Sequence, residues 1–136
     1  MHQNYYELSN GKQAVDYIYL GCLGFSYGNA FKYLVRASRK PGNSAESDLN
    51  KALTYITSSD REYSFIVRLL LRIRNWFVFN HAYSFNEHHI KHILKAIINF
   101  EKPAKIATMI VKYMQDRGIM VNDEFKQYAP SSKNIS

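Results

Sequence analysis

The chain has 136 residues, of which 46% are hydrophobic, so we expect one folded domain rather than two domains or a disordered chain. The net charge of +7 is concentrated between residues 61 and 118, where ten Lys and Arg face four Asp and Glu, and it favours an acidic partner such as a nucleotide, a nucleic acid or an acidic protein. The single cysteine, Cys22, excludes an intrachain disulfide, and without an N-terminal signal region or a run of ~18 apolar residues we expect a soluble cytoplasmic protein with no membrane contact.

The first half of the chain predicts three helices. A capping-box pattern at Asn10 and Gln13 opens the first of them. Ser26 is a suitable N-cap for the second, whose apolar residues recur at helical spacing. Residues 41–44 contain Pro, Gly, Asn and Ser, which end one helix and begin the next, and the third helix continues to Ile56. The last two helices are therefore expected to form a hairpin around a tight basic turn.

The polar faces of this hairpin suggest a binding site. On its first helix, polar residues follow one another at three- and four-residue steps: Asn29, Lys32, Arg36, and Arg39 or Lys40. The second helix has Asp48, Lys51 and Tyr55 at similar steps. The N-terminus of that helix carries a partial positive charge and, beside the cations of the turn, would suit a phosphate. An ordinary helical hairpin with a solvated basic face is the alternative interpretation.

A long fourth helix is predicted from about residue 60 to residue 79. Apolar residues form a wide stripe along it, and arginines line its other side. Arg68 and Arg72 lie one turn apart with no acidic neighbour, an arrangement typical of a surface that faces phosphates. A solvated face on which the arginine stems pack is the alternative.

Two further helices are expected, one from Ser84 and one that begins at Pro103 and ends at Gly118. Almost no segment alternates as a strand does, so the predicted fold is all-α, a compact bundle of about six helices with no sheet. Residues 1–118 are expected to form a single helical domain. Residues 119–136 are polar and aperiodic, and we expect them to form a flexible tail.

Motifs of the common enzyme classes are missing from the sequence. It contains neither a P-loop nor a Gly-x-Ser-x-Gly elbow. Glu46 and Asp48 stand two residues apart, on different helix faces, and make a poor two-metal site. Asp48 could hold one Mg²⁺ beside a phosphate bound by Arg39 and Lys40. Residues 39–44 are too rich in Pro, Gly and polar residues for a helix-turn-helix, which leaves sequence-specific DNA binding as a third choice.

Three motifs carry a family resemblance: Gly-Asn-Ala-Phe-Lys-Tyr at 28–33, Arg-Ala-Ser-Arg-Lys at 36–40 and Asp-Leu-Asn-Lys-Ala at 48–52, followed by Tyr55. Together they resemble the core pattern of a small family of unknown function that is widespread in tailed bacteriophages and whose members are often labelled nucleotide kinases. The resemblance covers residues 13–57, the hairpin core. The basic helical extension over residues 60–118 has no counterpart in it.

This resemblance implies a phage-encoded nucleotide-binding protein that acts in the cytoplasm of an infected bacterium, and the activity that it suggests is that of a deoxynucleoside monophosphate kinase. The catalytic residues would then be Arg36, Asp48 and Lys51. Phosphate and nucleotide would be bound by Asn29, Lys32, Arg39, Lys40 and Tyr55. Mg²⁺ would be the cofactor, held by Asp48.

A non-enzymatic role is the alternative hypothesis. A phage protein of this length could act as an inhibitor or adaptor that binds a host or defence protein, such as a nuclease, or a nucleic acid. Its contact surface would be the basic face of the fourth predicted helix, at Arg68 and Arg72, and it could form oligomers.

Overall fold

The structure, a computed structural model, describes residues 6–39, 44–59, 62–79, 87 and 89–129. The helices are α1 (Ala14–Gly21), α2 (Gly24–Arg39), α3 (Ser44–Thr57), α4 (Phe65–Val78), α5 (Lys91–Ile98), α6 (Pro103–Asp116) and the short 3-10 helix η2 (Asp123–Tyr128). Within the described ranges the only strand-like pairing is one isolated bridge between Glu7 and Gln13, so the all-α prediction is confirmed. None of these helices is long and apolar enough to cross a membrane.

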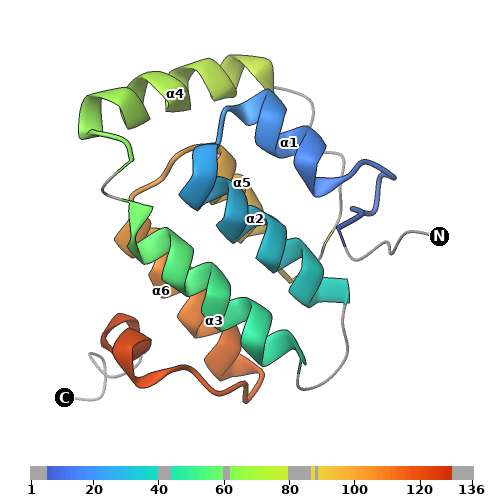
Figure 1. Ribbon diagram of the computed structural model, residues 1–136, viewed down its shortest axis with the longest axis vertical. Coiled ribbons are helices and arrows are strands. Elements are labelled where there is room, and N and C mark those ends of the chain that lie inside the picture. The colour runs from blue at the N-terminus through green and yellow to red at the C-terminus, as the bar shows by residue number, and fades with distance from the viewer. Residues whose placement is uncertain (1–5, 40–43, 60–61, 80–86, 88, 130–136) are drawn as a thin grey trace.

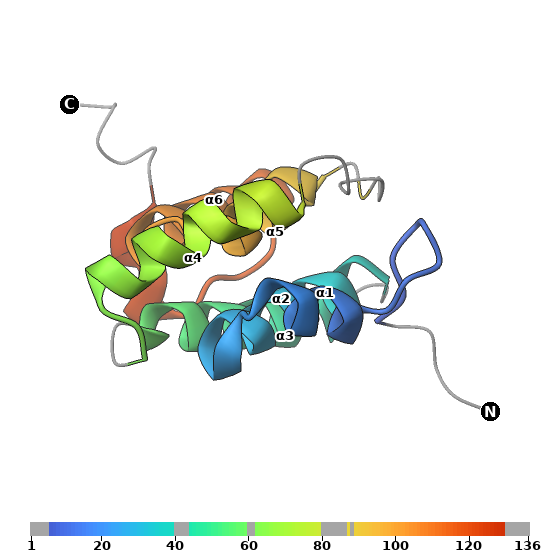
Figure 2. The same ribbon diagram turned by 90° about the horizontal axis from the view of Figure 1, so that it is seen from above.

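The helices form two layers. Figure 2 shows α1, α2 and α3 in one layer and α4, α5 and α6 in the other. In Figure 1, α2 and α3 lie side by side as the predicted hairpin, and α4 crosses one end of the molecule. The core lies between the layers, where these side chains are fully buried: Phe31, Leu34, Leu53, Ile97 and Ile110. The burial of each of these side chains contributes about 1.5–3 kcal/mol to the stability of the fold. The apolar contact between the two layers therefore holds them together.

The starts of the first two helices differ in detail from the sequence prediction. The N-cap of α1 is Gln13, whose side chain and that of Asp16 bond each other's backbone N–H, so the helix begins later than expected. Helix α2 begins at Gly24, ahead of the predicted cap Ser26. A carboxylate from a distant part of the chain performs the capping: Glu62 accepts bonds from the backbone N–H of Ser26 (3.0 Å) and from its hydroxyl. The sequence around Ser26 carries no signal of this partner.

The chain that follows α6, predicted to be a flexible tail, packs against the domain in the structure. Val121 and Phe125 are buried in the core. Asn50 of α3 joins this segment to the rest, since its side chain donates to the carbonyl of Met120 (3.1 Å) and accepts from the backbone N–H of Asn122 (2.9 Å). The segment is short and mixes its apolar residues with many polar ones, which explains why its sequence indicated a tail.

Asn50→Ala is expected to lower the free energy of unfolding by about 1 kcal/mol, because it removes two part-buried hydrogen bonds to the backbone of this segment. Amide hydrogen exchange should rise selectively over residues 119–129. Asn122→Ala is the matched control. It keeps the backbone N–H that donates to Asn50, so the free energy of unfolding should change little. Equal effects of the two substitutions would contradict this account.

Helix α4 is turned with its polar side toward the domain and its apolar side toward solvent. Asn75 is fully buried, whereas the large apolar side chains of the helix are exposed. The Asn75 amide donates to the carbonyls of Gly21 (2.9 Å) and Ile98 (2.7 Å), where α1 and α5 end. Its side-chain oxygen accepts from Arg74 (2.6 Å), which also donates to Leu20 (2.9 Å). Hydrogen bonds to helix ends therefore fix the orientation of α4.

Candidate functional site

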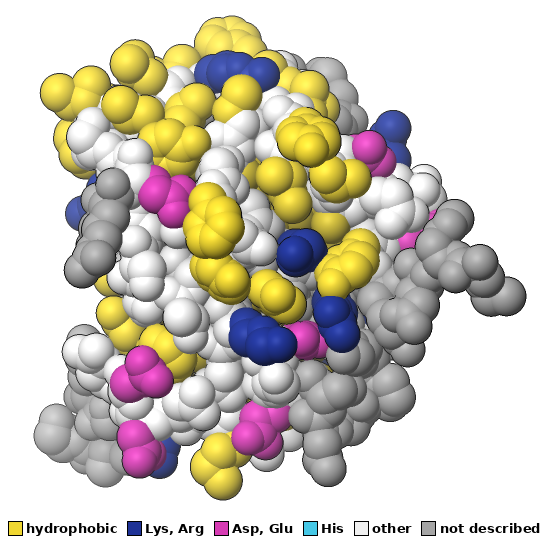
Figure 3. Space-filling view, viewed as in Figure 1, with side chains coloured by type: hydrophobic (Ala, Val, Ile, Leu, Met, Phe, Trp, Pro, Cys, Tyr) yellow, Lys and Arg dark blue, Asp and Glu magenta, His cyan; other side chains and the backbone are white. Residues whose placement is uncertain are grey.

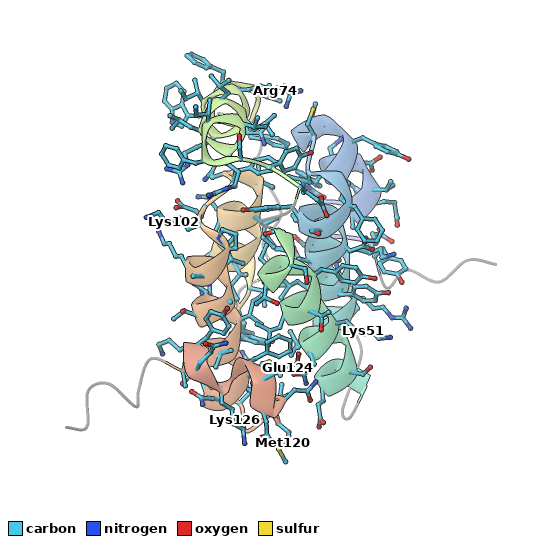
Figure 4. The ribbon with its side chains drawn as sticks, turned by 60° about the vertical axis from the view of Figure 1, so that its left-hand side comes forward. Lys51, Arg74, Lys102, Met120, Glu124 and Lys126 are labelled. Atoms are coloured by element: carbon cyan, nitrogen blue, oxygen red, sulfur yellow. The ribbon has the colours of Figure 1, made fainter. Side chains whose placement is uncertain are left out.

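Cations and aromatic rings gather on the outer surface of the hairpin. Figure 3 shows Lys and Arg side chains lying among hydrophobic ones over α2 and α3, with an acidic side chain between them. In Figure 4, Lys51 projects from α3 away from the core. We call this surface the cation–tyrosine face; its residues are Tyr6, Lys32, Tyr33, Arg36, Lys51 and Tyr55.

The rings of Tyr33 and Tyr55 stack across the two helices, with centroids 5.8 Å apart and planes 7° from parallel. Phe25 meets Tyr55 edge-on at 5.5 Å. The ammonium groups of Lys32 and Lys51 lie 5.1 and 5.4 Å from the centroid of the Tyr33 ring. Because a cation over a ring face is attracted by the ring quadrupole, Tyr33 holds two like charges near one another on the surface. This is a place where an anion relieves charge repulsion.

Arg36 is held in place by two neighbours. Its Nη1 donates to the hydroxyl of Tyr6 (2.8 Å), and its Nε lies 3.4 Å from the carboxylate of Asp48. The hydrogen bond to Tyr6 raises the pKa of the Arg36 guanidinium, and the negative charge of Asp48 raises it further. The side chain of Arg36 remains 31% exposed, while that of Asp48 is only 3% exposed. Asp48 therefore orients Arg36 from beneath, and Arg36 presents the charge to solvent.

A magnesium site at Asp48, as implied by the family resemblance, does not fit this arrangement. The carboxylate is buried against Arg36, and Mg²⁺ prefers an accessible carboxylate together with substrate oxygens and water. Across the described part of the chain, no three His, Cys, Asp or Glu side chains come close enough to hold a metal. Asp48 is better understood as a positioning residue for Arg36.

The remaining predicted ligands at the hairpin take other partners. Arg39 forms an ion pair with Glu87 (3.0 Å), and the same carboxylate accepts from the backbone N–H and the hydroxyl of Ser9. The amide of Asn29 donates to a carbonyl one turn earlier in its own helix (2.8 Å). Lys40 lies outside the described residues. The structure thus brings Lys32, Arg36, Lys51, Tyr55 and Asp48 together, and it ties Arg39 to an acid.

Sequence reasoning missed Tyr6 and Tyr33 as members of the site. Tyr6 lies in a short entry segment that shows no periodicity, so nothing in the sequence indicated that its hydroxyl reaches Arg36. Tyr33 could have been found, because it follows Lys32 in one of the matched motifs and stands three residues before Arg36.

The predicted partner surface at Arg68 and Arg72 is also placed differently. Arg72 donates to the carbonyls of Asn99 (3.1 Å) and Phe100 (3.4 Å) and lies 3.3 Å from the Glu101 carboxylate. The Nε of Arg68 is buried, and it has no hydrogen-bond partner among the described residues. Arg72 is thus bonded to the domain, although its side chain is 41% exposed, and the Nε of Arg68 is turned away from solvent.

A shallow hollow of about 660 Å³ adjoins the cation–tyrosine face at Lys51. Its lining is polar and comes from α3 and the segment after α6: Glu46, Ser47, Asn50, Lys51, Thr54 and Asn122. The ammonium group of Lys51 can therefore serve an anion that lies on the face or one that enters this hollow.

Comparison with known proteins gave one family match. Residues 5–57 match the model of a protein family of unknown function (DUF3310), and this segment contains the first layer of helices and the whole cation–tyrosine face. No curated protein and no solved structure matches the chain. The predicted resemblance to a family of unknown function is thus confirmed for residues 5–57, and this part of the chain is similar to DUF3310.

Proposed function

We propose that the cation–tyrosine face binds a nucleotide. The observation that carries the proposal is the grouping of Lys32, Arg36 and Lys51 around the stacked pair of Tyr33 and Tyr55. Phosphate oxygens bind where several cations converge, and nucleobases stack on aromatic rings. The grouping offers both kinds of contact within one surface.

The charge of this surface is prearranged. The face carries three cations, Lys32, Arg36 and Lys51, and one buried carboxylate, Asp48, so its net charge is positive before a ligand arrives. Tyr6 and Asp48 hold the guanidinium of Arg36, which reduces the entropy lost when it binds a phosphate. Arg36 is accordingly the residue that we expect to form the most directional phosphate contact.

A kinase that acts on deoxynucleoside monophosphates is the enzymatic form of this proposal, in line with the label that members of the resembling phage family often carry. Lys32, Arg36 and Lys51 would stabilise the charge that spreads over a transferred phosphoryl group. Mg²⁺ would have to arrive bound to the phosphates, since Asp48 is engaged with Arg36. A thermal-shift screen with mono- and triphosphates, with and without Mg²⁺, separates binding from turnover when it is paired with an assay for phosphate transfer.

Lys51→Ala is expected to weaken nucleotide binding about tenfold, which corresponds to ~1.4 kcal/mol, with no change in melting temperature of the free protein. Isothermal titration at low salt measures the affinity, and Lys32→Ala should behave in the same way. Lys105→Ala is the matched control, because Lys105 is 59% exposed and lies on α6, where it pairs with Glu101.

Tyr55→Ala tests the stacking contact separately. This substitution should lower the affinity for a nucleotide but leave the affinity for inorganic triphosphate unchanged, because only the nucleotide has a base that stacks on the ring. If no nucleotide binds, or if Lys51→Ala and Lys105→Ala have equal effects, the cation–tyrosine face is not a nucleotide site.

We do not extend the proposal to a protein or nucleic-acid partner bound through Arg68 and Arg72. The Nε of Arg68 is buried, and Arg72 is engaged by carbonyls and by Glu101. The exposed surface of α4 is mostly apolar, so it suits an apolar partner better than an acidic one.

A further inference from the structure

The outward side of α4 is mostly apolar, although Arg74 is also exposed on the helix. Nine large side chains on it are exposed by 39 to 69%, and we call them together the α4 apolar face: Phe65, Ile66, Val67, Leu69, Leu70, Ile73, Trp76, Phe77 and Val78. In Figure 3 hydrophobic side chains gather at the end of the molecule where Figure 1 shows α4. Figure 4 shows side chains of α4 projecting away from the domain.

This exposure cannot be relieved by a rotation of the helix. Asn75 and Arg72 are bonded on the inward side to carbonyls at the ends of α1 and α5 and in the loop after α5. A rotation that buried the apolar side would leave those carbonyls unpaired and carry the polar groups to the surface. These hydrogen bonds therefore keep the α4 apolar face exposed to solvent.

The size of the face matches that of a stable protein interface. Large apolar side chains have on the order of 150–250 Å² each, so nine of them at these exposures leave roughly 800–900 Å² open to solvent. A standard interface buries about 800 Å² on each partner, whereas the largest apolar patch on a typical monomer is about 300–600 Å².

The spacing within the face indicates that the partner is a helix. Ile66, Leu70, Ile73 and Phe77 recur at steps of four, three and four residues and are exposed by 50 to 69%. This 3.5-residue repeat forms the seam through which two helices pack knobs into holes. The seam carries no charged side chain, so a copy of itself can bury it at no electrostatic cost.

A lipid membrane is a less suitable partner for the α4 apolar face than a second helix. Helices that lie on membranes carry Lys and Arg along the edge of their apolar side, where the cations reach lipid head groups. Here Arg72 is bonded inward, and Arg74 donates to the carbonyl of Leu20 and to Asn75. Arg72 and Arg74 are thus engaged within the domain.

We propose that the chain forms a twofold-symmetric dimer in which the α4 apolar faces of two copies pack against each other. Under a twofold axis that crosses the helix, the two copies of α4 run antiparallel, an arrangement that their macrodipoles also favour. The cation–tyrosine face lies on α2, α3 and the segment before α1, outside this contact, so the dimer is independent of nucleotide binding.

The first test is the mass in solution. Sedimentation equilibrium should give twice 15.9 kDa at micromolar concentration. Ile73→Glu should give a folded monomer, because it places a charge on the seam. Met120→Glu is the matched control: Met120 is also apolar and 63% exposed, and Figure 4 places it at the opposite end of the molecule from α4. A monomeric wild-type chain, or a dimer that Ile73→Glu leaves intact, would overturn the proposal.

A cross-linking experiment provides a second test, which does not require the protein to fold with a charged residue at position 73. In a Cys22→Ser background, Ile73→Cys should form an intermolecular disulfide under mild oxidation, because residue 73 lies near the middle of α4 and therefore near the twofold axis. Ile66→Cys should not cross-link to itself, since antiparallel overlap separates the two copies by about 16 Å along the helix at a rise of ~1.5 Å per residue. Equal cross-linking of the two variants, or none at Ile73, contradicts the antiparallel dimer. Co-flotation of a monomeric chain with anionic vesicles would assign the face to lipid instead.

Discussion

Arg36→Ala is expected to lower the free energy of unfolding by about 2–4 kcal/mol, a larger loss than for any other cation of the cation–tyrosine face. The reason is that Asp48 is almost fully buried and has the Arg36 guanidinium 3.4 Å from one of its oxygens. Removal of that cation leaves a buried negative charge with less compensation. The partial exposure of Arg36 keeps the expected loss at the lower end of what broken buried pairs cost.

Chemical denaturation of the single and double variants measures this loss. Lys32→Ala is the matched control and should cost less than about 0.5 kcal/mol, since its ammonium group contacts rings at the surface and no buried acid. Arg36→Ala combined with Asp48→Ala should recover part of the loss, because the buried charge is then gone as well. If Arg36→Ala were as stable as the wild type, the coupling of these two residues would be refuted. A loss of nucleotide binding in Arg36→Ala is therefore informative only at a temperature where the variant is folded.

Asn75→Ala is expected to destabilise the protein by about 2–4 kcal/mol, because it removes both donors that reach the buried carbonyls of Gly21 and Ile98 and leaves the two acceptors unpaired. The same substitution removes the acceptor for Arg74. Since these bonds join α4 to α1 and α5, amide exchange within α4 should rise more than exchange within α2 and α3.

Two further variants separate the donors from the volume of the side chain. Asn75→Asp keeps the shape and the acceptor but loses the amide donors, so it should be at least as destabilising as Asn75→Ala. Thr108→Ala, at an exposed hydroxyl that bonds only within α6, should be close to neutral. A stable Asn75→Asp variant would show that packing, rather than the two hydrogen bonds, fixes α4.

The hairpin of α2 and α3 could be predicted because its apolar residues repeat at helical spacing over several turns. Leu34 and Leu53, for example, belong to the predicted stripes and are fully buried. The orientation of α4 could not be predicted. Its wide apolar stripe is visible in the sequence, but the side that turns inward is decided by Asn75, whose partners lie 54 and 23 residues away.

The candidate site was likewise predictable from the sequence only in part. Steps of three and four residues were sufficient to group Lys32 with Arg36 on one helix face. They were not sufficient to assign Asp48, whose role depends on its burial beneath Arg36, nor Arg39, which a distant acid, Glu87, draws into an ion pair. Local spacing reports which side chains share a face, whereas long-range packing decides what each of them can bind.

The two-layer arrangement has a consequence for how such a protein can evolve. The segment that matches DUF3310 provides one layer, and its inner surface, with Phe31, Leu34 and Leu53, is covered by α5 and α6 from outside the match. A polypeptide limited to residues 5–57 would expose those apolar side chains to water. Another amphipathic pair of helices could bury these side chains in place of α5 and α6. The positively charged outer surface of α2 and α3 could then stay the same while the helices packed against the inner surface changed.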